Sequence, residues 1–364
     1  MMNSTKITLS EAAFTEKEKV FLQNEAFTAT LFRYSTQVCA VRLSNSKINL
    51  VVLPFQGQQV WRFESPIGDL TMKSIFQEPE NTTRFGLNYG AFLIHCGLTA
   101  NGNPSAEDSH PLHGELPNCH YQEAWLVIGS DEHGDYMALG GSYTYRNSLE
   151  YHYEFAPELR MRPDSALVDV QIQARNFRPK PMKYMYMSHI NWLPVDGSRL
   201  VCSADPKSTE VFSDTFGLPN SDQQKFMNYT ERLSADPTIA DKIDSSSQFY
   251  DPELCMYLHY TPDEQAYAHA MQVYPAGDAA YVAFRTKELP NAVRWFARTG
   301  SEDALAFAIP STNNHLGFAR NAAKGLIREI GAKDSLDMHY QFGYLTSDER
   351  RDVESKIYQV LGKA

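Results

Sequence analysis

Short segments that alternate apolar and polar residues recur along almost the whole chain, and this pattern constrains the fold more than any other feature. The clearest is the segment from residue 167 to 175, whose apolar residues fall on one face: Val168, Val170, Ile172 and Ala174. The residues at positions 169, 171, 173 and 175 are polar, and a period of two is typical of a β-strand with one buried and one solvated face. We therefore predict a half-buried strand here.

More than a dozen segments show strand-like composition, and many are bounded by Gly, Pro, Asn or Asp residues that favour turns. The chain also contains 20 Tyr and 20 Phe, which favour strands over helices. The predicted strands are Val38–Leu43, Ile48–Leu53, Gln59–Phe63, Ala124–Ile128, Tyr136–Tyr145, Glu150–Phe155, Ala166–Ala174, Lys183–Asn191, Cys255–Tyr260, Ala266–Tyr274, Ala279–Arg285, Ala292–Arg298, Ala304–Ile309 and Met338–Leu345. So many strands with so few helices predict an all-β protein, a large antiparallel β-sandwich closed mostly by itself.

Helical signals are few. A short charged helix is predicted at Thr15–Leu22, and residues 203–244 are predicted to form a long polar loop. The clearest helix is C-terminal, at residues 346–364, where Thr346 can cap the first turn while Glu349 reaches back. Its apolar stripe consists of Val353, Ile357, Val360 and Leu361. Since no repeat or composition shift divides the chain, we predict one domain over residues 1–364, with residues 1–36 as an N-terminal extension.

Charge and hydropathy exclude several classes of protein. The 33 basic and 44 acidic side chains give a net charge of −11, and no Lys/Arg-rich run is present, so we expect no nucleic-acid partner. No apolar stretch approaches the roughly 18–20 residues that span a bilayer, so we expect no membrane partner. The first residues lack the apolar core of a signal peptide, and the five cysteines are spaced as free buried thiols. These features predict a cytoplasmic protein.

Three histidine-containing segments are the candidate sites of chemistry. His95 interrupts an apolar strand-like run, His189 interrupts an aromatic and Met-rich one, and His113 lies between His110 and Glu115 in a Pro- and Gly-bounded segment. A lone histidine in a strand is commonly a buried structural residue. Three such segments strengthen the functional interpretation, because each buried imidazole requires a partner.

A metal site at His110, His113 and Glu115 is the alternative to weigh. These residues offer nitrogen and oxygen donors that zinc or manganese use. Pro111 separates the two histidines, however, and strand alternation places His113 and Glu115 on one face with His110 on the other. No second cluster completes a ligand set, so we expect no metal. Serine-hydrolase, phosphate-loop and HExxH motifs are also absent from the sequence.

The order of four segments carries a resemblance to a known family. Asn45–Val60, Pro111–Asn118 (PLHGELPN) and Ser188–Pro194 (SHINWLP) resemble the corresponding parts of aldose 1-epimerases, the galactose mutarotase-like proteins. The tail Ile309–Leu345 is similar to the divergent branch of that family known as DUF4432. Together these segments cover about residues 38–345 in the family's order.

The resemblance implies a single-domain β-supersandwich that interconverts the α and β anomers of a free hexose or hexose derivative. In that reaction a base removes the anomeric hydroxyl proton while an acid protonates the ring oxygen, so that the ring opens and can close to the other anomer. The resemblance implies a small-molecule sugar as partner, and the reaction requires no cofactor or metal. The particular sugar and the oligomeric state stay open.

The resemblance also assigns roles to individual residues. His189 matches the general acid of the family, and His113 matches the histidine that bonds the substrate near the ring oxygen. Trp192 and Trp295 are candidates to stack on the sugar's apolar face. Where the family has an arginine that grips sugar hydroxyls, this sequence has His95, with Arg84 as a possible substitute from a few residues earlier.

The general base is the point of departure from the family. The family's glutamate belongs to the segment that here spans residues 307–315, and this segment contains no carboxylate. Glu115 is our first choice for the base, because it is close to His113 in the sequence. The alternatives are His315, or a water held by Asn313 and Asn314. A further alternative is a non-catalytic carbohydrate-binding or regulatory protein that uses the same cleft.

Overall fold

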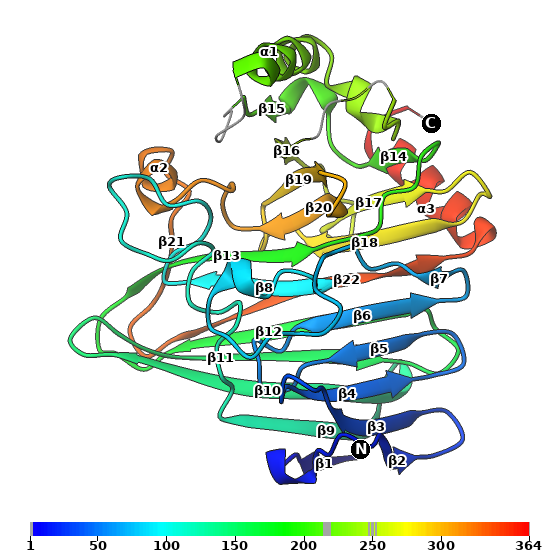
Figure 1. The fold of residues 1–364 in the computed structure, drawn as a ribbon, viewed down its shortest axis with the longest axis vertical. Coiled ribbons are helices and arrows are strands. Elements are labelled where there is room, and N and C mark those ends of the chain that lie inside the picture. Colours follow the sequence, from blue (N-terminus) through cyan, green and yellow to red (C-terminus); the bar gives the residue numbers. More distant parts are fainter. Residues whose placement is uncertain (1–2, 214–219, 247, 249–250, 252, 364) are drawn as a thin grey trace.

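Two large antiparallel sheets form the body of the protein in a computed structural model that describes residues 3–213, 220–246, 248, 251 and 253–363 (Figure 1). The first is a nine-stranded sheet in the order β1-β9-β10-β11-β12-β22-β18-β17-β14. Its strands are β1 (Asn3–Thr8), β9 (Glu123–Asp131), β10 (Gly134–Asn147), β11 (Tyr151–Met161), β12 (Leu167–Asn176), β22 (Ser335–Leu345), β18 (Ala279–Arg285), β17 (Tyr267–Val273) and β14 (Arg199–Cys202).

The second sheet has 13 strands, in the order β15-β16-β19-β20-β13-β8-β6-β5-β4-β3-β2, with β21 beside β13 and β7 beside β6. Its strands are β15 (Glu210–Val211), β16 (Leu254–His259), β19 (Asn291–Arg298), β20 (Asp303–Ser311), β13 (Met182–Ile190), β8 (Leu93–Leu98), β6 (Val60–Ser65), β5 (Asn49–Val52), β4 (Cys39–Ser44), β3 (Thr28–Arg33), β2 (Lys19–Gln23), β21 (Arg328–Ile330) and β7 (Gly68–Asp69). The all-β antiparallel sandwich predicted from the sequence is therefore confirmed.

Helices are short and peripheral. The α-helices are α1 (Asn220–Ala235), α2 (Phe318–Ala323) and α3 (Ser347–Val360), and the 3₁₀ helices are η1 (Glu11–Ala13), η2 (Phe85–Leu87), η3 (Pro206–Ser208) and η4 (Pro237–Asp241). The predicted C-terminal helix is present as α3, and Thr346 and Glu349 form its capping box. Ile357 of its apolar stripe is buried against the outer face of the nine-stranded sheet. None of the described helices is long and apolar enough to cross a bilayer.

Two predictions of local structure are wrong. The predicted helix at Thr15–Leu22 is instead a loop followed by β2, because residues 19–23 pair with β3 and tertiary pairing overrides the local helical signal. The predicted loop at residues 203–244 contains α1, in which Phe226, Tyr229 and Leu233 are buried on one face. Residues 3–33 of the predicted N-terminal extension supply β1 to one sheet and β2 and β3 to the other.

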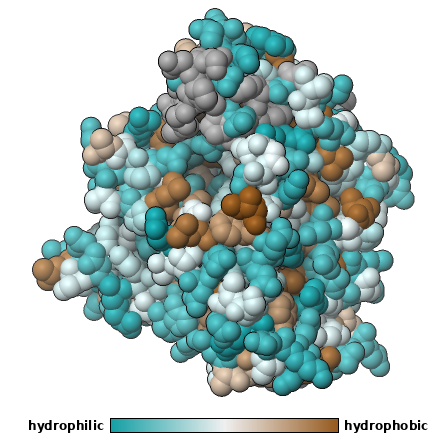
Figure 2. Space-filling view, in the orientation of Figure 1, coloured by the Kyte–Doolittle hydropathy of each residue, from teal (hydrophilic) through white to brown (hydrophobic). Residues whose placement is uncertain are grey.

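The main hydrophobic cluster contains residues of both sheets, so their inner faces pack on each other. In β12, Val168, Val170, Ile172 and Ala174 are buried, and the intervening residues are partly or fully exposed, as the alternating pattern predicts. The 13-stranded sheet differs because its outer face is also covered. A second cluster on that face includes Ile94, Cys96, Met187 and Trp295. Figure 2 shows hydrophobic side chains gathered near the middle of the visible face, over β8 and β13.

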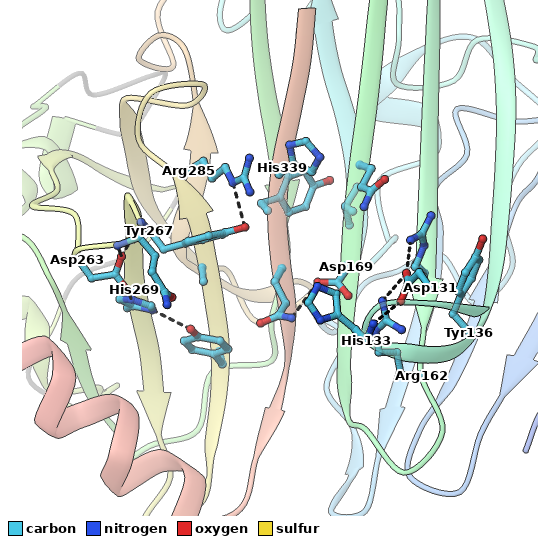
Figure 3. Close-up of a pocket in the computed structure, with 18 of the residues that line it drawn as sticks. Asp131, His133, Tyr136, Arg162, Asp169, Asp263, Tyr267, His269, Arg285 and His339 are labelled. Atoms are coloured by element: carbon cyan, nitrogen blue, oxygen red, sulfur yellow. Dashed lines mark hydrogen bonds and ion pairs between the residues drawn. The ribbon is translucent and has the colours of Figure 1, made fainter. Parts of the chain in front are cut away.

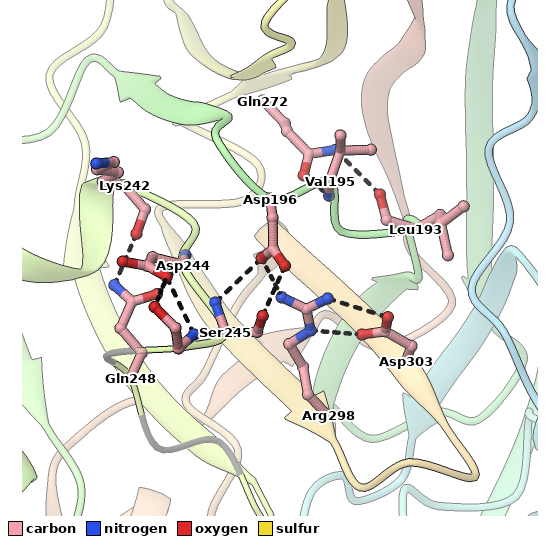
Figure 4. Close-up of polar contacts among 11 residues, drawn as sticks. Leu193, Val195, Asp196, Lys242, Asp244, Ser245, Gln248, Gln272, Arg298 and Asp303 are labelled. Atoms are coloured by element: carbon pink, nitrogen blue, oxygen red, sulfur yellow. Dashed lines mark hydrogen bonds and ion pairs between the residues drawn. The ribbon is translucent and has the colours of Figure 1, made fainter.

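A polar network ties the end of β13 to the β19–β20 hairpin (Figure 4). Arg298, the last residue of β19, donates to Asp303 at 2.7 and 3.1 Å and to Asp196 at 2.6 Å. Asp196 follows β13 and also accepts from the backbone and side chain of Ser245. Charge-assisted bonds of this kind hold geometry well. The network therefore fixes the two strands that carry His189 and Trp295 relative to each other.

Candidate functional site

A small cavity of about 130 Å³ opens on the outer face of the 13-stranded sheet. Strand alternation explains which side chains reach it: on β13, Met187 and His189 point outward, while Tyr186 and Ile190 belong to the core between the sheets. The lining residues described are Phe85, Tyr89, Asn103, Leu112, His113, Met187, His189, Glu253, Cys255, Val293, Trp295, Ile309 and His315. Four residues predicted from the sequence meet here: His113, His189, Trp295 and His315.

His189 is held in one orientation by an asparagine. Its Nδ1 lies 2.6 Å from Asn191 Oδ1, and Asn191 Nδ2 donates to the carbonyl of Ala91, which fixes the orientation of the amide. Neutral His189 must therefore donate from Nδ1, and Nε2 is the nitrogen that can exchange a proton with a ligand. Burial lowers the pKa of His189 to about 4. The ring is consequently neutral at pH 7.

His113 faces His189 across the cavity. Their ring centroids are 5.5 Å apart and the rings are perpendicular. His113 Nδ1 lies 3.3 Å from Asn101 Oδ1, which also accepts from the backbone of Gly102, so this imidazole too is oriented by an amide oxygen. Burial, together with the neighbouring imidazoles of His189 and His315, holds the pKa of His113 well below its usual range. Two uncharged histidines, each oriented by an amide oxygen, thus share one opening.

His315 is the third imidazole of the cavity, and among the described residues neither of its ring nitrogens has a hydrogen-bond partner. It is only 5% exposed, with the ring of Phe212 4.4 Å away. Burial, followed by the positive charges of Arg320 and Lys324, lowers its pKa to about 4. A buried polar ring without a partner is unfavourable. Either ring nitrogen could therefore form a hydrogen bond with a group that enters the cavity.

Trp295 and Glu253 complete one wall. The indole Nε1 of Trp295 donates to Glu253 Oε2 at 2.7 Å, and the indole lies 5.2 Å from the ring of His189. Glu253 was not among the predicted site residues. Its position could have been inferred from strand alternation. Cys255 of β16 faces outward, and Glu253, two residues earlier, is expected on the same face. The boundary of that strand had to be known before this inference could be made.

Glu115, our first choice for the base, does not line this cavity. The backbone at His113 and Gly114 has positive φ angles of 59° and 81°, so the chain turns and the alternation assumed from the sequence fails. The Glu115 carboxylate instead accepts from Tyr153 Oη at 2.6 Å, and from Thr99 Oγ1 at 2.7 Å and the backbone nitrogens of residues 98 and 99. It holds a loop in place, and burial raises its pKa.

His95 and Trp192 also point away from the cavity. His95 Nδ1 bonds Tyr186 Oη at 2.7 Å in the core between the sheets, and burial lowers the pKa of His95 to about 3. Trp192 is fully buried in the same core and stacks on Phe307. Both placements follow from alternation. His95 lies between the outward-facing Ile94 and Cys96 of β8, and Trp192 is three residues from the cavity-facing His189. The sequence interpretation did not assign the two faces of these segments.

The remaining candidates lie outside the cavity lining. Asn313 is buried, accepts from Thr312 and donates to the carbonyl of Asn314, so its amide is used inside the fold. His110 accepts from the backbone of Phe318 and does not join His113. Within the described part of the chain, no group of three or more His, Cys, Asp or Glu side chains is placed to hold a metal ion.

A second, larger cavity of about 620 Å³ lies on the outer face of the nine-stranded sheet (Figure 3). Its charged groups pair with one another. Asp131 binds Arg160 and Arg162 at 2.9 and 2.8 Å. Asp263 binds His269 at 3.0 Å, and the other ring nitrogen of His269 lies 2.7 Å from the hydroxyl of Tyr281. This polar groove contains none of the predicted site residues.

Two stacked antiparallel sheets, with a histidine-lined cavity on the outer face of the larger one, define a protein of galactose mutarotase-like fold. Solved structures of the same fold include a candidate aldose 1-epimerase from Klebsiella pneumoniae, with a TM-score of 0.82 and 15% identity over 100% of this chain and 96% of that one. A galactose mutarotase-like protein from Clostridium acetobutylicum has a TM-score of 0.59 and 11% identity, over 88% of this chain and 99% of that one. At these identities the likeness establishes the fold.

Residues 38–343 match the family model described as a domain of unknown function, DUF4432. The chain therefore belongs to the DUF4432 family. No curated protein sequence matches it.

Proposed function

We propose that this protein is a carbohydrate isomerase that interconverts the α and β anomers of a free monosaccharide by general acid/base ring opening. The observation that carries the proposal is the pair of facing imidazoles, His113 and His189, whose ring centroids lie 5.5 Å apart in one small cavity. Groups that each reach one sugar ring must lie within about 10 Å of each other. The galactose mutarotase-like fold supports the same conclusion.

The chemistry assigns a distinct task to each group. A base accepts the proton of the anomeric hydroxyl, the bond from C1 to the ring oxygen breaks, and C1 becomes a carbonyl carbon. The imidazolium form of His189, which carries a proton on both ring nitrogens, delivers its Nε2 proton to the ring oxygen as that bond breaks, and His113 bonds the sugar beside it. After rotation about the C1–C2 bond, the reverse transfers close the ring as the other anomer. No electrons are gained or lost.

The lining of the cavity supports an uncharged, single sugar as substrate. The cavity is smaller than the roughly 300–1,000 Å³ that drug-sized ligands occupy, so it favours one ring over a chain of rings. None of its described lining residues is Arg or Lys, the residues that bind phosphate and carboxylate groups. The indole of Trp295 supplies an apolar surface for the C–H face of the ring.

Saturation-transfer NMR on equilibrated glucose and galactose tests the proposal directly, because it measures anomer exchange without a coupled enzyme. Wild-type protein should accelerate exchange of at least one sugar in a panel of neutral hexoses and pentoses. The double variant His113→Ala/His189→Ala should reduce exchange to the buffer rate. His133→Ala is the control, since its side chain is 71% exposed on the other sheet. Equal rates for wild type, double variant and buffer would refute the isomerase.

A non-catalytic sugar-binding protein is the second candidate. The observations that favour it are the absence of a carboxylate from residues 307–315 and the lowered pKa values of His113 and His189. Calorimetry beside the exchange assay separates the two functions. Sugar binding that disappears in His315→Ala, together with exchange no faster than in buffer, would favour the binding protein.

A further inference from the structure

The proposed reaction needs a base near the sugar, and the sequence does not provide one where the family has it. Among the described residues that line the cavity, Glu253 is the one carboxylate. Asp and Glu side chains are effective bases in a buried site because removal from water favours proton uptake. Glu115, which the sequence favoured, already bonds Tyr153, Thr99 and the adjacent backbone away from the cavity.

Trp295 sets the position of Glu253 relative to His189, the proposed acid. The residue immediately precedes β16, a strand that pairs with β19 in register, so that Cys255 lies opposite Trp295. Its Oε2 atom accepts from the indole Nε1 at 2.7 Å, a bond that is charge-assisted when the carboxylate is ionised. The same indole lies 5.2 Å from the ring of His189. One rigid aromatic side chain therefore connects the carboxylate to the proposed acid.

The electrostatics agree with this placement. After burial, the charge of Glu253 is the next cause that raises the pKa of the buried Tyr89 hydroxyl. That tyrosine lies 5.9 Å from the ring of His189 and donates to Asn191, which orients His189. The negative charge of Glu253 is thus felt inside the cavity. His315 is a weaker base, because the charges of Arg320 and Lys324 add to burial in lowering its pKa.

We infer that Glu253 is the general base of the reaction, supplied from the position just before β16 instead of from residues 307–315, and that Trp295 is its positioning residue. The inference rests on the proposed function. In the ring-opening step a Glu253 oxygen takes the proton from the anomeric oxygen, and His189 Nε2 gives a proton to the ring oxygen. In ring closure each group reverses its task, so both return to their starting protonation states.

The variant Glu253→Gln keeps the size and polarity of the side chain while removing its basicity. Its kcat for anomer exchange should fall by about 10²-fold or more, as expected for loss of a general base. Its sugar affinity, measured by calorimetry, should stay within about threefold of wild type. Glu302→Gln is the matched control, because Glu302 bonds Thr299 at the tip of the β19–β20 hairpin and does not line the cavity.

Trp295→Phe separates positioning from general structural damage. Loss of the indole N–H removes a hydrogen bond that favours the ionised carboxylate, so the acid limb of the kcat profile should move to higher pH. Circular dichroism and the unfolding midpoint establish that each variant is folded. If Glu253→Gln fails to fold, Glu253→Asp replaces it, with reduced kcat and unchanged sugar affinity as the expected result.

Three outcomes separate the base assignment from the function itself. Wild-type kcat in Glu253→Gln would overturn the assignment while leaving the isomerase intact. A loss of sugar affinity as large as the loss of kcat would also overturn it, since Glu253 would then be a binding residue. If wild-type protein shows no exchange with any sugar of the panel, the proposed function fails, and the assignment of Glu253 fails with it.

Discussion

The two cavities, on opposite outer faces of the sandwich, are both lined by histidine and tyrosine side chains but differ in how their polar atoms are paired. In the groove of the nine-stranded sheet, histidine and aspartate pair with each other: Asp263 binds His269 and Lys356, and His269 also bonds Tyr281. In the cavity of the 13-stranded sheet, neither ring nitrogen of His315 has a hydrogen-bond partner within the part of the chain that the structure describes. We therefore interpret the paired polar groups as structural on one face and the unpaired ring as available to a ligand on the other.

The larger cavity is therefore the weaker candidate for a site. Its volume of about 620 Å³ exceeds the 130 Å³ of the histidine cavity, yet its ionised side chains already neutralise one another. The volume of a cavity says only how large a ligand can fit. The free energy that a ligand gains on binding depends on how many polar groups in the lining still lack a hydrogen-bond partner. If this comparison is right, the two faces respond to mutation in opposite ways.

The largest difference is expected between two histidine variants. His189→Ala should lower kcat/KM for anomer exchange by about 10²–10⁴-fold, because it removes a proton donor. His269→Ala in the groove should leave kcat/KM unchanged and lower the free energy of unfolding instead. Exchange kinetics and urea unfolding on both variants measure the contrast. A loss of activity in His269→Ala instead of His189→Ala would contradict the assignment of the site to the histidine cavity.

A pH profile sharpens the role of His189. Only the imidazolium carries a proton on Nε2, since neutral His189 keeps its proton on Nδ1, toward Asn191. With the pKa lowered to about 4, kcat/KM should fall by about tenfold per pH unit above that value. Asn191→Asp places a carboxylate beside Nδ1, which favours the charged ring, so the falling limb should move to higher pH. A limb that stays in place would contradict the acid role.

Variants in the groove of the nine-stranded sheet should change the free energy of unfolding. The side chain of Asp263 is 3% exposed and accepts from His269, Lys356 and the backbone of Tyr267. We expect Asp263→Ala to lower the free energy of unfolding by about 2–3 kcal/mol without changing exchange kinetics. Its partners lower the pKa of Asp263, so this stabilisation is present above about pH 4 and declines as the pH falls further. Urea titrations at pH 7 and pH 3 on wild type and variant test both statements.

Alternation along strands made much of the fold predictable. In β12 the apolar residues at every second position are buried as expected, and Ala279–Arg285 has the bounds that the sequence predicts. The period of two shows which residues of a strand share a face, but it does not show which of the two faces points toward the core between the sheets. Tyr184–Pro194 is apolar on both sides because both faces of the 13-stranded sheet are covered, so nothing in the segment distinguishes the cavity side of His189 from the core side of Trp192.

The site was less predictable than the fold for a related reason. Glu115 stands two residues after His113, and a strand would have placed them together, but two residues with positive φ turn the chain between them. Positive φ is uncommon at a non-glycine residue, and although histidine adopts it more often than most residues, a histidine alone does not predict it. Glu253 is remote from every histidine in the sequence, and only the pairing of β16 with β19 brings it to Trp295.

The smallest predicted effect tests the premise of the comparison, that an unpaired buried ring is held for a ligand at a cost in stability. His315→Leu replaces the ring with an apolar side chain of similar volume, so it should raise the free energy of unfolding by about 1 kcal/mol at pH 7. The gain should be larger at pH 5. The folded-state pKa of His315 is lowered to about 4, so wild type loses stability as the pH falls from about 6.5 toward 4, at up to about 1.4 kcal/mol per pH unit. Sugar affinity should weaken in the same variant, because the ligand loses the ring that it would bond. A variant that is less stable than wild type and binds sugar equally well would show that His315 belongs with the paired, structural histidines.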